Sequence, residues 1–237
     1  MTLNTRLLID GLKKHNISLS DRQLADFKTY AAMLVERNKS TNLTAITDPD
    51  GIAVKHFTDS VLPLGFVDIP KGSKLVDIGA GAGFPSVPLK IMRRDMNMTL
   101  LDGLNKRLLF LNAVAERLEM ELTAVHMRAE DAGRDVAFRG KFDFAAARAV
   151  ASLPELLEYA IPLLKVDGVF LAYKGYDCEA EINGARNAFA ELDCKLEKVF
   201  KAELIDGSGR SVLLIRKTAE TPERYPRHGS KITKKPL

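Results

Sequence analysis

From Leu75 onward the sequence alternates short apolar runs with amphipathic helical periods, and this alternation restricts the fold more than any other feature. The runs KLVDIG, MTLLD, FDFAAARA and GVFLAYKG are each followed by a helix-like stretch, and a further run, LTAVHM, precedes FDFAAARA. This pattern predicts right-handed β-α-β crossovers and a mostly parallel sheet with helices on both faces. The last two runs, KLEKVFKAEL and RSVLLIRK, have no helix between them and predict an antiparallel hairpin. The predicted class is a doubly wound, Rossmann-like α/β fold.

The chain before this alternation shows a helical pattern of apolar residues instead. Leu3, Leu7, Leu8 and Leu12 lie on one face of a helix, and the segment from Ser20 to Gln23 resembles a capping box that opens a second helix. Pro and Gly near residue 70 mark a boundary. We therefore expect three parts: an N-terminal helical extension packed on the core (1–70), the main α/β domain (71–217) and a basic C-terminal tail (218–237).

Charge distinguishes the tail from the rest of the chain. The net charge is +4, but residues 216–237 hold seven Lys/Arg against two Glu, whereas residues 1–215 hold 28 basic and 29 acidic residues. The tail is consistent with a solvated terminus or with an electrostatic contact for a polyphosphate. Composition does not separate these two interpretations.

Several features bear on location and on metal chemistry. No apolar run approaches the roughly 18 residues that a membrane span needs, and the first residues do not form a signal-peptide core. A cytoplasmic, monomeric protein with no membrane contact is expected. Cys178 and Cys194 form neither a C-x-x-C pair nor part of a His-rich cluster, so no disulfide or metal site is predicted.

A glycine-rich turn follows the first predicted strand, and its spacing bears on the ligand. Gly79, Gly81 and Gly83 read G-x-G-x-G, whereas the dinucleotide fingerprint is G-x-G-x-x-G. Asp77 precedes the turn, where a carboxylate would repel a pyrophosphate but attract the ammonium and sulfonium of S-adenosylmethionine. Asp102 ends the second strand, where it can accept hydrogen bonds from ribose hydroxyls, as it would in an NAD site. The turn and the closing hairpin together favour a class I S-adenosylmethionine-dependent methyltransferase over a dehydrogenase.

Two further points concern the same region. After the third strand, Ala129 and Glu130 are placed to meet an adenine edge, although a Glu at this place is commonly a helix cap. Alternating Gly and Ala also suit a plain strand-to-helix turn with no ligand.

At the level of whole motifs the chain resembles the glucose-inhibited division protein B family. The resemblance is carried by DIGAGAGFPSVPL, LLDGLNKRLLFL, RAEDA, ARAVASL and AYKG, by the upstream NLTAI and KHFTDS, and by the ending RYPRHGSKITKKPL. It implies a bacterial methyltransferase that modifies guanine N7 in 16S ribosomal RNA. It also implies that the cofactor-contacting positions include Gly79, Phe84, Ala129, Glu130 and Arg148. Ser86 stands where glycine is common in the family, and YPRHGS lacks the proline usual before the glycine.

The implied chemistry suggests roles for further residues. Guanine N7 already carries a lone pair, so no general base is required. Arg148 and Lys174, which end two strands, are the catalytic candidates. Arg148 suits the acceptor edge of guanine; the alternative is that it only pairs with Glu155 or Asp143. Candidate RNA-contacting residues are Asn42, His56, Lys106, Arg107, Arg224 and Arg227, together with Asp59 and Tyr225.

Two rival functions remain open on the sequence. A methyltransferase that acts on small metabolites would have the same S-adenosylmethionine-binding residues, and the basic tail would have no role in binding its substrate. A noncatalytic ribosome-assembly factor would keep the cofactor pocket only as part of its fold. If the tail binds RNA, its removal should weaken RNA binding and flatten the salt dependence while S-adenosylmethionine affinity stays nearly unchanged.

Overall fold

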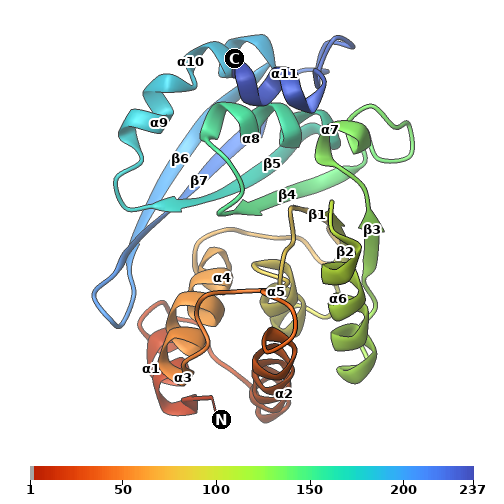
Figure 1. Cartoon of the computed structure of the whole chain (residues 1–237). Coiled ribbons are helices and arrows are strands. Elements are labelled where there is room, and N and C mark those ends of the chain that lie inside the picture. Colours follow the sequence, from red (N-terminus) through yellow and green to blue (C-terminus); the bar gives the residue numbers. More distant parts are fainter. Residues whose placement is uncertain (1–2) are drawn as a thin grey trace.

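The structure is a computed structural model that describes residues 3–237, and its centre is a twisted seven-stranded sheet (Figure 1). The strand order is β3-β2-β1-β4-β5-β7-β6. The strands are β1 (Lys74–Ile78), β2 (Asn97–Asp102), β3 (Thr123–His126), β4 (Phe142–Arg148), β5 (Leu164–Gly175), β6 (Cys194–Glu203) and β7 (Gly209–Lys217).

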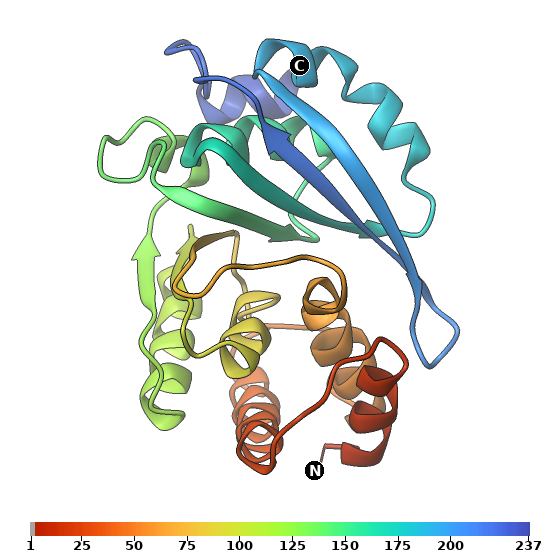
Figure 2. The ribbon, with the colours of Figure 1, turned by 180° about the vertical axis from the view of Figure 1, so that it is seen from behind.

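The first five strands run parallel, and the last two form the predicted antiparallel hairpin. Strand β7 pairs with β5 as well as with β6, so the hairpin is inserted with its second strand next to the parallel part. The turn of the hairpin reaches toward α1 (Thr5–Lys13) in both ribbon views (Figures 1 and 2), and Lys14 forms an ion pair with Glu203 there. The predicted fold class is confirmed.

One face of the sheet is covered by the N-terminal helices together with helices of the α/β unit (Figure 1). Phe27, Tyr30 and Phe57 are fully buried and share one apolar core with Leu75 and Leu100 of the sheet, so the N-terminal helices pack directly on the sheet. The helical segments on this side are α1, α2 (Asp21–Asn38), α3 (Pro49–Gly51), the π-helical turn η1 (Ile52–Thr58), α4 (Asp59–Val61), η2 (Leu62–Gly65), α5 (Ser86–Met92) and α6 (Asn105–Arg117). The capping box predicted at Ser20 and Gln23 opens α2.

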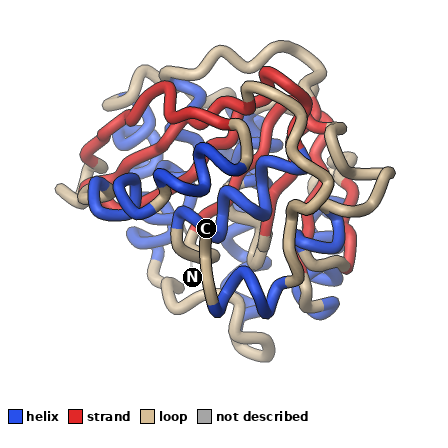
Figure 3. The backbone as a smooth tube through the Cα atoms, turned by 90° about the horizontal axis from the view of Figure 1, so that it is seen from above, coloured by secondary structure: helices blue, strands red, loops and turns tan. Residues whose placement is uncertain are grey.

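The opposite face carries a second core, and the view from above shows helices lying over the strands (Figure 3). Leu156 and Leu157 of α8 pack against Phe170 and Leu213 of the sheet. The segments on this side are α7 (Ala129–Ala132), α8 (Leu153–Ala160), η3 (Ile161–Leu163), α9 (Glu179–Gly184), α10 (Arg186–Glu191) and α11 (Gly229–Lys234). In the part of the chain that the structure describes, no helix is both long and apolar enough to cross a bilayer.

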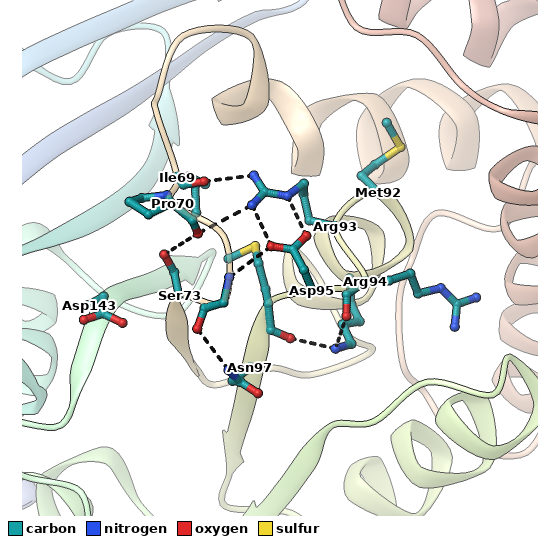
Figure 4. Close-up of polar contacts among 12 residues, drawn as sticks. Ile69, Pro70, Ser73, Met92, Arg93, Arg94, Asp95, Asn97 and Asp143 are labelled. Atoms are coloured by element: carbon teal, nitrogen blue, oxygen red, sulfur yellow. Dashed lines mark hydrogen bonds and ion pairs between the residues drawn. The ribbon is translucent and has the colours of Figure 1, made fainter.

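The boundary predicted near residue 70 is a rigid junction (Figure 4). Arg93 donates from Nε and Nη2 to the two carboxylate oxygens of Asp95, both at 2.8 Å, and from Nη1 to the carbonyl of Ile69 at 3.0 Å. Asp95 in turn accepts from the backbone N–H of Gly72 at 3.1 Å. These bonds hold the pKa of the Asp95 carboxyl well below its usual range, with the Arg93 hydrogen bonds as the largest cause. The linker is thereby fixed to the start of β1, at the edge of the sheet away from the strand carboxyl ends.

Candidate functional site

Two cavities lie side by side at the carboxyl ends of the parallel strands, the edge where ligands bind in open α/β sheets. The first, which we call the acidic cavity, has a volume of about 770 Å³, within the usual range for small-molecule sites. It lies at the ends of β1 to β4, and its walls include Gly79, Asp102, Met127, Arg128, Ala129, Glu130, Asp131, Val150, Ala151, Glu155, Tyr159, His228, Gly229, Ser230 and Thr233.

The second, which we call the basic cavity, has a volume of about 490 Å³ and lies between the ends of β4 and β5, η1 and the start of β7. Its walls are Ile46, Lys55, His56, Asp59, Arg148, Ala149, Ala151, Tyr173, Lys174, Gly175, Glu181 and Arg210. Ala151 lines both cavities. The loop after β4 is therefore the wall that they share.

The two cavities carry opposite charge. The acidic cavity is lined by the carboxylates of Asp102, Glu130, Asp131 and Glu155 against a single arginine, Arg128. In the basic cavity four cationic side chains face two carboxylates; the cations are Lys55, Arg148, Lys174 and Arg210. A small cationic ligand suits the first cavity, and an anionic polymer with its base edges suits the second.

The glycine turn follows β1, and its first glycine, Gly79, lines the acidic cavity. Gly79, Gly81 and Gly83 all have positive φ (67°, 57° and 100°), a conformation that side chains disfavour. Val150 packs so closely on Gly79 that an added Cβ would lie 2.9 Å from Val150 Cγ2. Asp102 is almost fully buried, and its two oxygens accept the backbone N–H groups of Gly81 (2.9 Å) and Leu104 (2.8 Å). The carboxylate therefore holds the turn in place at the cavity wall.

Asp77 does not stand at the lip of this turn, which corrects the sequence-based expectation. Its side chain is fully buried, it does not line the acidic cavity, and Oδ2 accepts a hydrogen bond from Ser86 Oγ. Burial raises the pKa of the Asp77 carboxyl to about 7, although the Ser86 hydrogen bonds oppose this shift. Asp77 thus supports the turn from beneath, and Ser86, where glycine was expected, supplies its partner. The negative charge at the cavity belongs to the four carboxylates named above.

Arg148 is the centre of the basic cavity and is held from several sides. Its Nη1 donates to Asp59 Oδ2 at 2.9 Å, and its Nη2 lies 3.3 Å from His56 Nδ1. The guanidinium also lies over the ring of Phe84, at 4.9 Å from the centroid. Arg210 Nε approaches the same Asp59 oxygen at 3.4 Å. The partners of Arg148 are therefore not Glu155 or Asp143, which cap α8 and bind Lys165 respectively.

His56 is neutral in this arrangement. A guanidinium only donates hydrogen bonds, so His56 Nδ1 is the acceptor and Nε2 carries the proton that it donates to Thr44 Oγ1 at 2.8 Å. Burial, followed by the charge of Arg148, lowers the pKa of His56 to about 3. The ring stacks on Phe84 at a centroid distance of 4.2 Å. These contacts make His56 a rigid support for Arg148.

Lys174 lines the basic cavity, but its ammonium is already engaged. It donates to the carbonyl of Ala151 at 3.0 Å and forms an ion pair with Glu181 at 2.6 Å. Because Ala151 belongs to the shared wall, this bond fixes the loop between the two cavities. Ala149 in that loop has a positive φ of 56°.

The sequence-based cofactor residues fall into two groups in space. Four of them line the acidic cavity, namely Gly79, Asp102, Ala129 and Glu130. The others support its floor or lie on the side of the basic cavity, namely Asp77, Gly81, Gly83, Phe84 and Arg148.

The candidate RNA-contacting residues are dispersed. His56 lines the basic cavity; Asn42 and Lys106 are exposed on the surface. Arg107 donates to Asp102 at 3.3 Å. Arg224 pairs with Glu191, and Arg227 pairs with the fully buried Glu158 at 2.6 Å. Arg227 is thus an internal ion-pair partner, with little of its side chain left to meet RNA.

Sequence reasoning missed several lining residues. Lys55 and Arg210 enter the basic cavity from segments far apart in the chain, and no local motif marks them. It also missed that His228, Gly229, Ser230 and Thr233 form a wall of the acidic cavity. The only sequence signal for these is the resemblance of the C-terminal ending itself.

The sheet order with its closing hairpin and the paired cavities define a class I methyltransferase fold. The chain belongs to the family described as rRNA small subunit methyltransferase G (GidB), whose model matches residues 23–206. It is 44% identical over 233 residues to the Ribosomal RNA small subunit methyltransferase G of Lactococcus lactis, covering 97% of each chain. It is 42% identical over 235 residues to the protein of the same name from Desulforamulus reducens, covering 98% of each.

Solved structures support the fold assignment. The chain superposes on TrmN from Thermus thermophilus with a TM-score of 0.52 and 18% identity, over 67% of this chain and 48% of that one. It superposes on TYW2 from M. jannaschii, solved in complex with AdoMet, with a TM-score of 0.50 and 15% identity, over 62% of this chain and 70% of that one. At this identity the likeness concerns the fold.

Proposed function

We propose that this protein transfers the methyl group of S-adenosylmethionine to N7 of a guanine in 16S ribosomal RNA, as a cytoplasmic monomer. The observation that carries the proposal is the pair of oppositely charged cavities that meet at Ala151. A methyl group has to pass directly between two ligands that are in contact and held in line, and cavities that adjoin at a shared residue place their ligands next to each other. The names of the relatives support ribosomal RNA as the substrate.

The residues of the acidic cavity fit the methyl donor. The donor supplies a methyl group bound to a positively charged sulfur, and its sulfonium and ammonium favour a cavity with an excess of carboxylates. Asp102 is already fixed by two backbone N–H groups and can accept hydrogen bonds from ribose hydroxyls. The absence of a side chain at Gly79 lets Val150 pack on the turn, and both residues line the cavity.

The basic cavity fits a guanine from a single-stranded or splayed segment of RNA. Arg148 offers N–H groups suited to the O6 acceptor of guanine, and Asp59, His56 and Phe84 fix its plane. Lys55 and Arg210 lie on the same wall, where they can meet phosphate oxygens.

The reaction needs no general base. The N7 lone pair of guanine attacks the methyl carbon while the carbon–sulfur bond breaks and its electron pair remains on sulfur, so the positive charge moves to the purine and no proton leaves. The site agrees with this requirement. His56 is neutral and hydrogen-bonded, with a pKa lowered to about 3 mainly by burial, and the Lys174 ammonium is paired with Glu181.

The test is incubation of the full-length protein with methyl-labelled donor and, in separate reactions, small ribosomal subunits, protein-free 16S RNA, transfer RNA and a metabolite extract. We expect label in 16S RNA at one guanine, found by borohydride reduction and aniline cleavage, which detect N7-methylguanine. Label only in the metabolite extract would identify a small-molecule methyltransferase. Donor binding without transfer to any of these substrates would favour an assembly factor.

A further inference from the structure

The C-terminal segment, residues 218–235, is bound along the surface of the fold instead of projecting as an arm. Arg139 donates to the backbone carbonyls of Gly133, Thr221, Pro222 and Tyr225 at 2.7–3.3 Å. The Arg139 guanidinium thus holds the backbone at Thr221–Pro222 and at Tyr225 against the loop after α7.

An internal ion pair and apolar contacts continue this attachment. Arg227 donates to both carboxylate oxygens of Glu158 on α8, and its backbone N–H donates to the same side chain at 2.7 Å. Glu158 is fully buried, and so is Ile232 of α11. Because a buried carboxylate is costly without its partner, the segment is held in one position.

The place where the segment ends is the acidic cavity. His228, Gly229, Ser230 and Thr233 form a wall of this cavity, with Gly229 next to Glu130. The family model ends at residue 206, so these wall residues lie outside the part of the chain that it matches.

Within this wall, Gly229 packs directly against Glu130. A Cβ atom added at Gly229 would lie 2.1 Å from Glu130 Oε1 and 2.9 Å from its Cδ. Real atoms do not approach so closely, so any side chain at residue 229 displaces the Glu130 carboxylate. Gly229 does not have a positive φ. An alanine there is therefore compatible with the backbone, and the far end of Glu130 has to move.

The orientation of the donor follows from the shared wall. The transferred methyl group has to lie near Ala151, where the two cavities meet, so the adenosine half extends away from Ala151 toward Glu130 and α11. We propose that the C-terminal segment completes the binding site for the adenosine half of the methyl donor, and that Gly229 is the positioning residue that sets the place of Glu130. This inference rests on the proposed function of the acidic cavity.

The experiment compares wild type, Gly229→Ala and the control Gly184→Ala, whose added Cβ meets no atom within 4 Å. Calorimetry measures Kd for S-adenosylmethionine, S-adenosylhomocysteine and 5′-methylthioadenosine. We expect Gly229→Ala to weaken all three by about tenfold, because all three share the adenosine. The control should bind like wild type. The Tm of the ligand-free protein should be unchanged in Gly229→Ala.

A double-mutant cycle tests the route through Glu130. If Gly229 acts by placing Glu130, Gly229→Ala adds no further loss of affinity in a Glu130→Ala background. Independent, additive losses would overturn the positioning role, and wild-type affinity in Gly229→Ala would overturn the proposal as a whole. A wild-type protein that binds the donor but methylates no RNA would refute the proposed substrate and leave this inference standing, whereas one that binds no donor would refute both.

Discussion

The acidic and basic cavities differ in how the chain builds them. The acidic cavity is assembled mainly from short segments that directly follow successive parallel strands, such as Ile78–Gly79, Leu101–Gly103 and Met127–Asp131. The basic cavity depends on residues distant in sequence, since Arg148 is bound to Asp59, 89 positions away, and Arg210 comes from the hairpin. Apart from the wall that the C-terminal segment supplies, the cofactor side is thus encoded locally, whereas the target side depends on tertiary packing.

The largest effect is expected from replacing Arg148. The replacement should lower the rate of methyl transfer but leave donor affinity unchanged, which would assign the two cavities different functions. In Arg148→Lys an ammonium cannot serve Asp59, His56 and a guanine together, so the rate of methyl transfer at saturating donor should fall about 100-fold, or ~2.7 kcal/mol. Single-turnover assays with labelled donor measure the rate, and calorimetry should show donor Kd within about twofold of wild type. Arg186→Lys, on exposed α10, is the control. An equal loss of donor affinity would instead assign Arg148 to the donor, as the family resemblance implies.

The reverse outcome is expected for Asp102, on the acidic side. Asp102→Asn keeps the shape of the side chain but removes its charge and leaves one of the two backbone N–H groups facing an amide NH2, so donor Kd should rise about 30-fold, or ~2 kcal/mol. The rate at saturating donor should stay near that of wild type. Asp131→Asn, on the exposed rim of the same cavity, should change Kd only a few-fold. If Asp102→Asn slowed transfer at saturating donor while leaving Kd intact, the functional separation of the cavities would be wrong.

The smallest effect concerns which basic residues meet RNA. Lys55→Ala should weaken binding of 16S RNA modestly and reduce the slope of log K against log salt concentration by about 0.7, the contribution of one phosphate contact on a single strand. Arg224→Ala should leave the slope unchanged, because Arg224 lines neither cavity and its ion pair with Glu191, at 2.8 Å, is shorter than that of Lys55 with Asp206, at 3.8 Å. Filter binding over a salt series measures both. A reduced slope in Arg224→Ala would show that the C-terminal segment contacts RNA, as its charge suggests.

The sequence predicted those parts of the fold that depend on local pattern. Alternating strand and helix periods, the capping box at Ser20 and Gln23, and the two apolar runs of the hairpin are all local signals, and all are present in the structure. The insertion of β7 between β5 and β6 was not predicted, because strand order depends on pairing between distant segments.

The candidate site was predicted in the same uneven way. Gly79, Asp102, Ala129 and Glu130 lie together on one cavity because motifs at strand ends converge at one edge of the sheet. The burial of Asp77 could not be predicted from the sequence. Whether a carboxylate at the end of a strand faces a cavity or the core depends on which helix covers it. The charge of residues 216–237 suggested an RNA contact. In the structure, however, Arg227 forms an internal ion pair with Glu158, and α11 forms part of the wall of the acidic cavity. Donor affinity should therefore not survive removal of the tail, contrary to the sequence-based expectation.

The position of α11 also has a practical consequence for handling the protein. Leu237 packs against the same core as α8, only a few residues beyond Thr233 in the wall of the acidic cavity. A purification tag or reporter fused after Leu237 would sit beside the small-ligand site and pull on its last helix, so fusions belong at the amino-terminal end, and inactivity of a carboxyl-tagged preparation says little about the native enzyme.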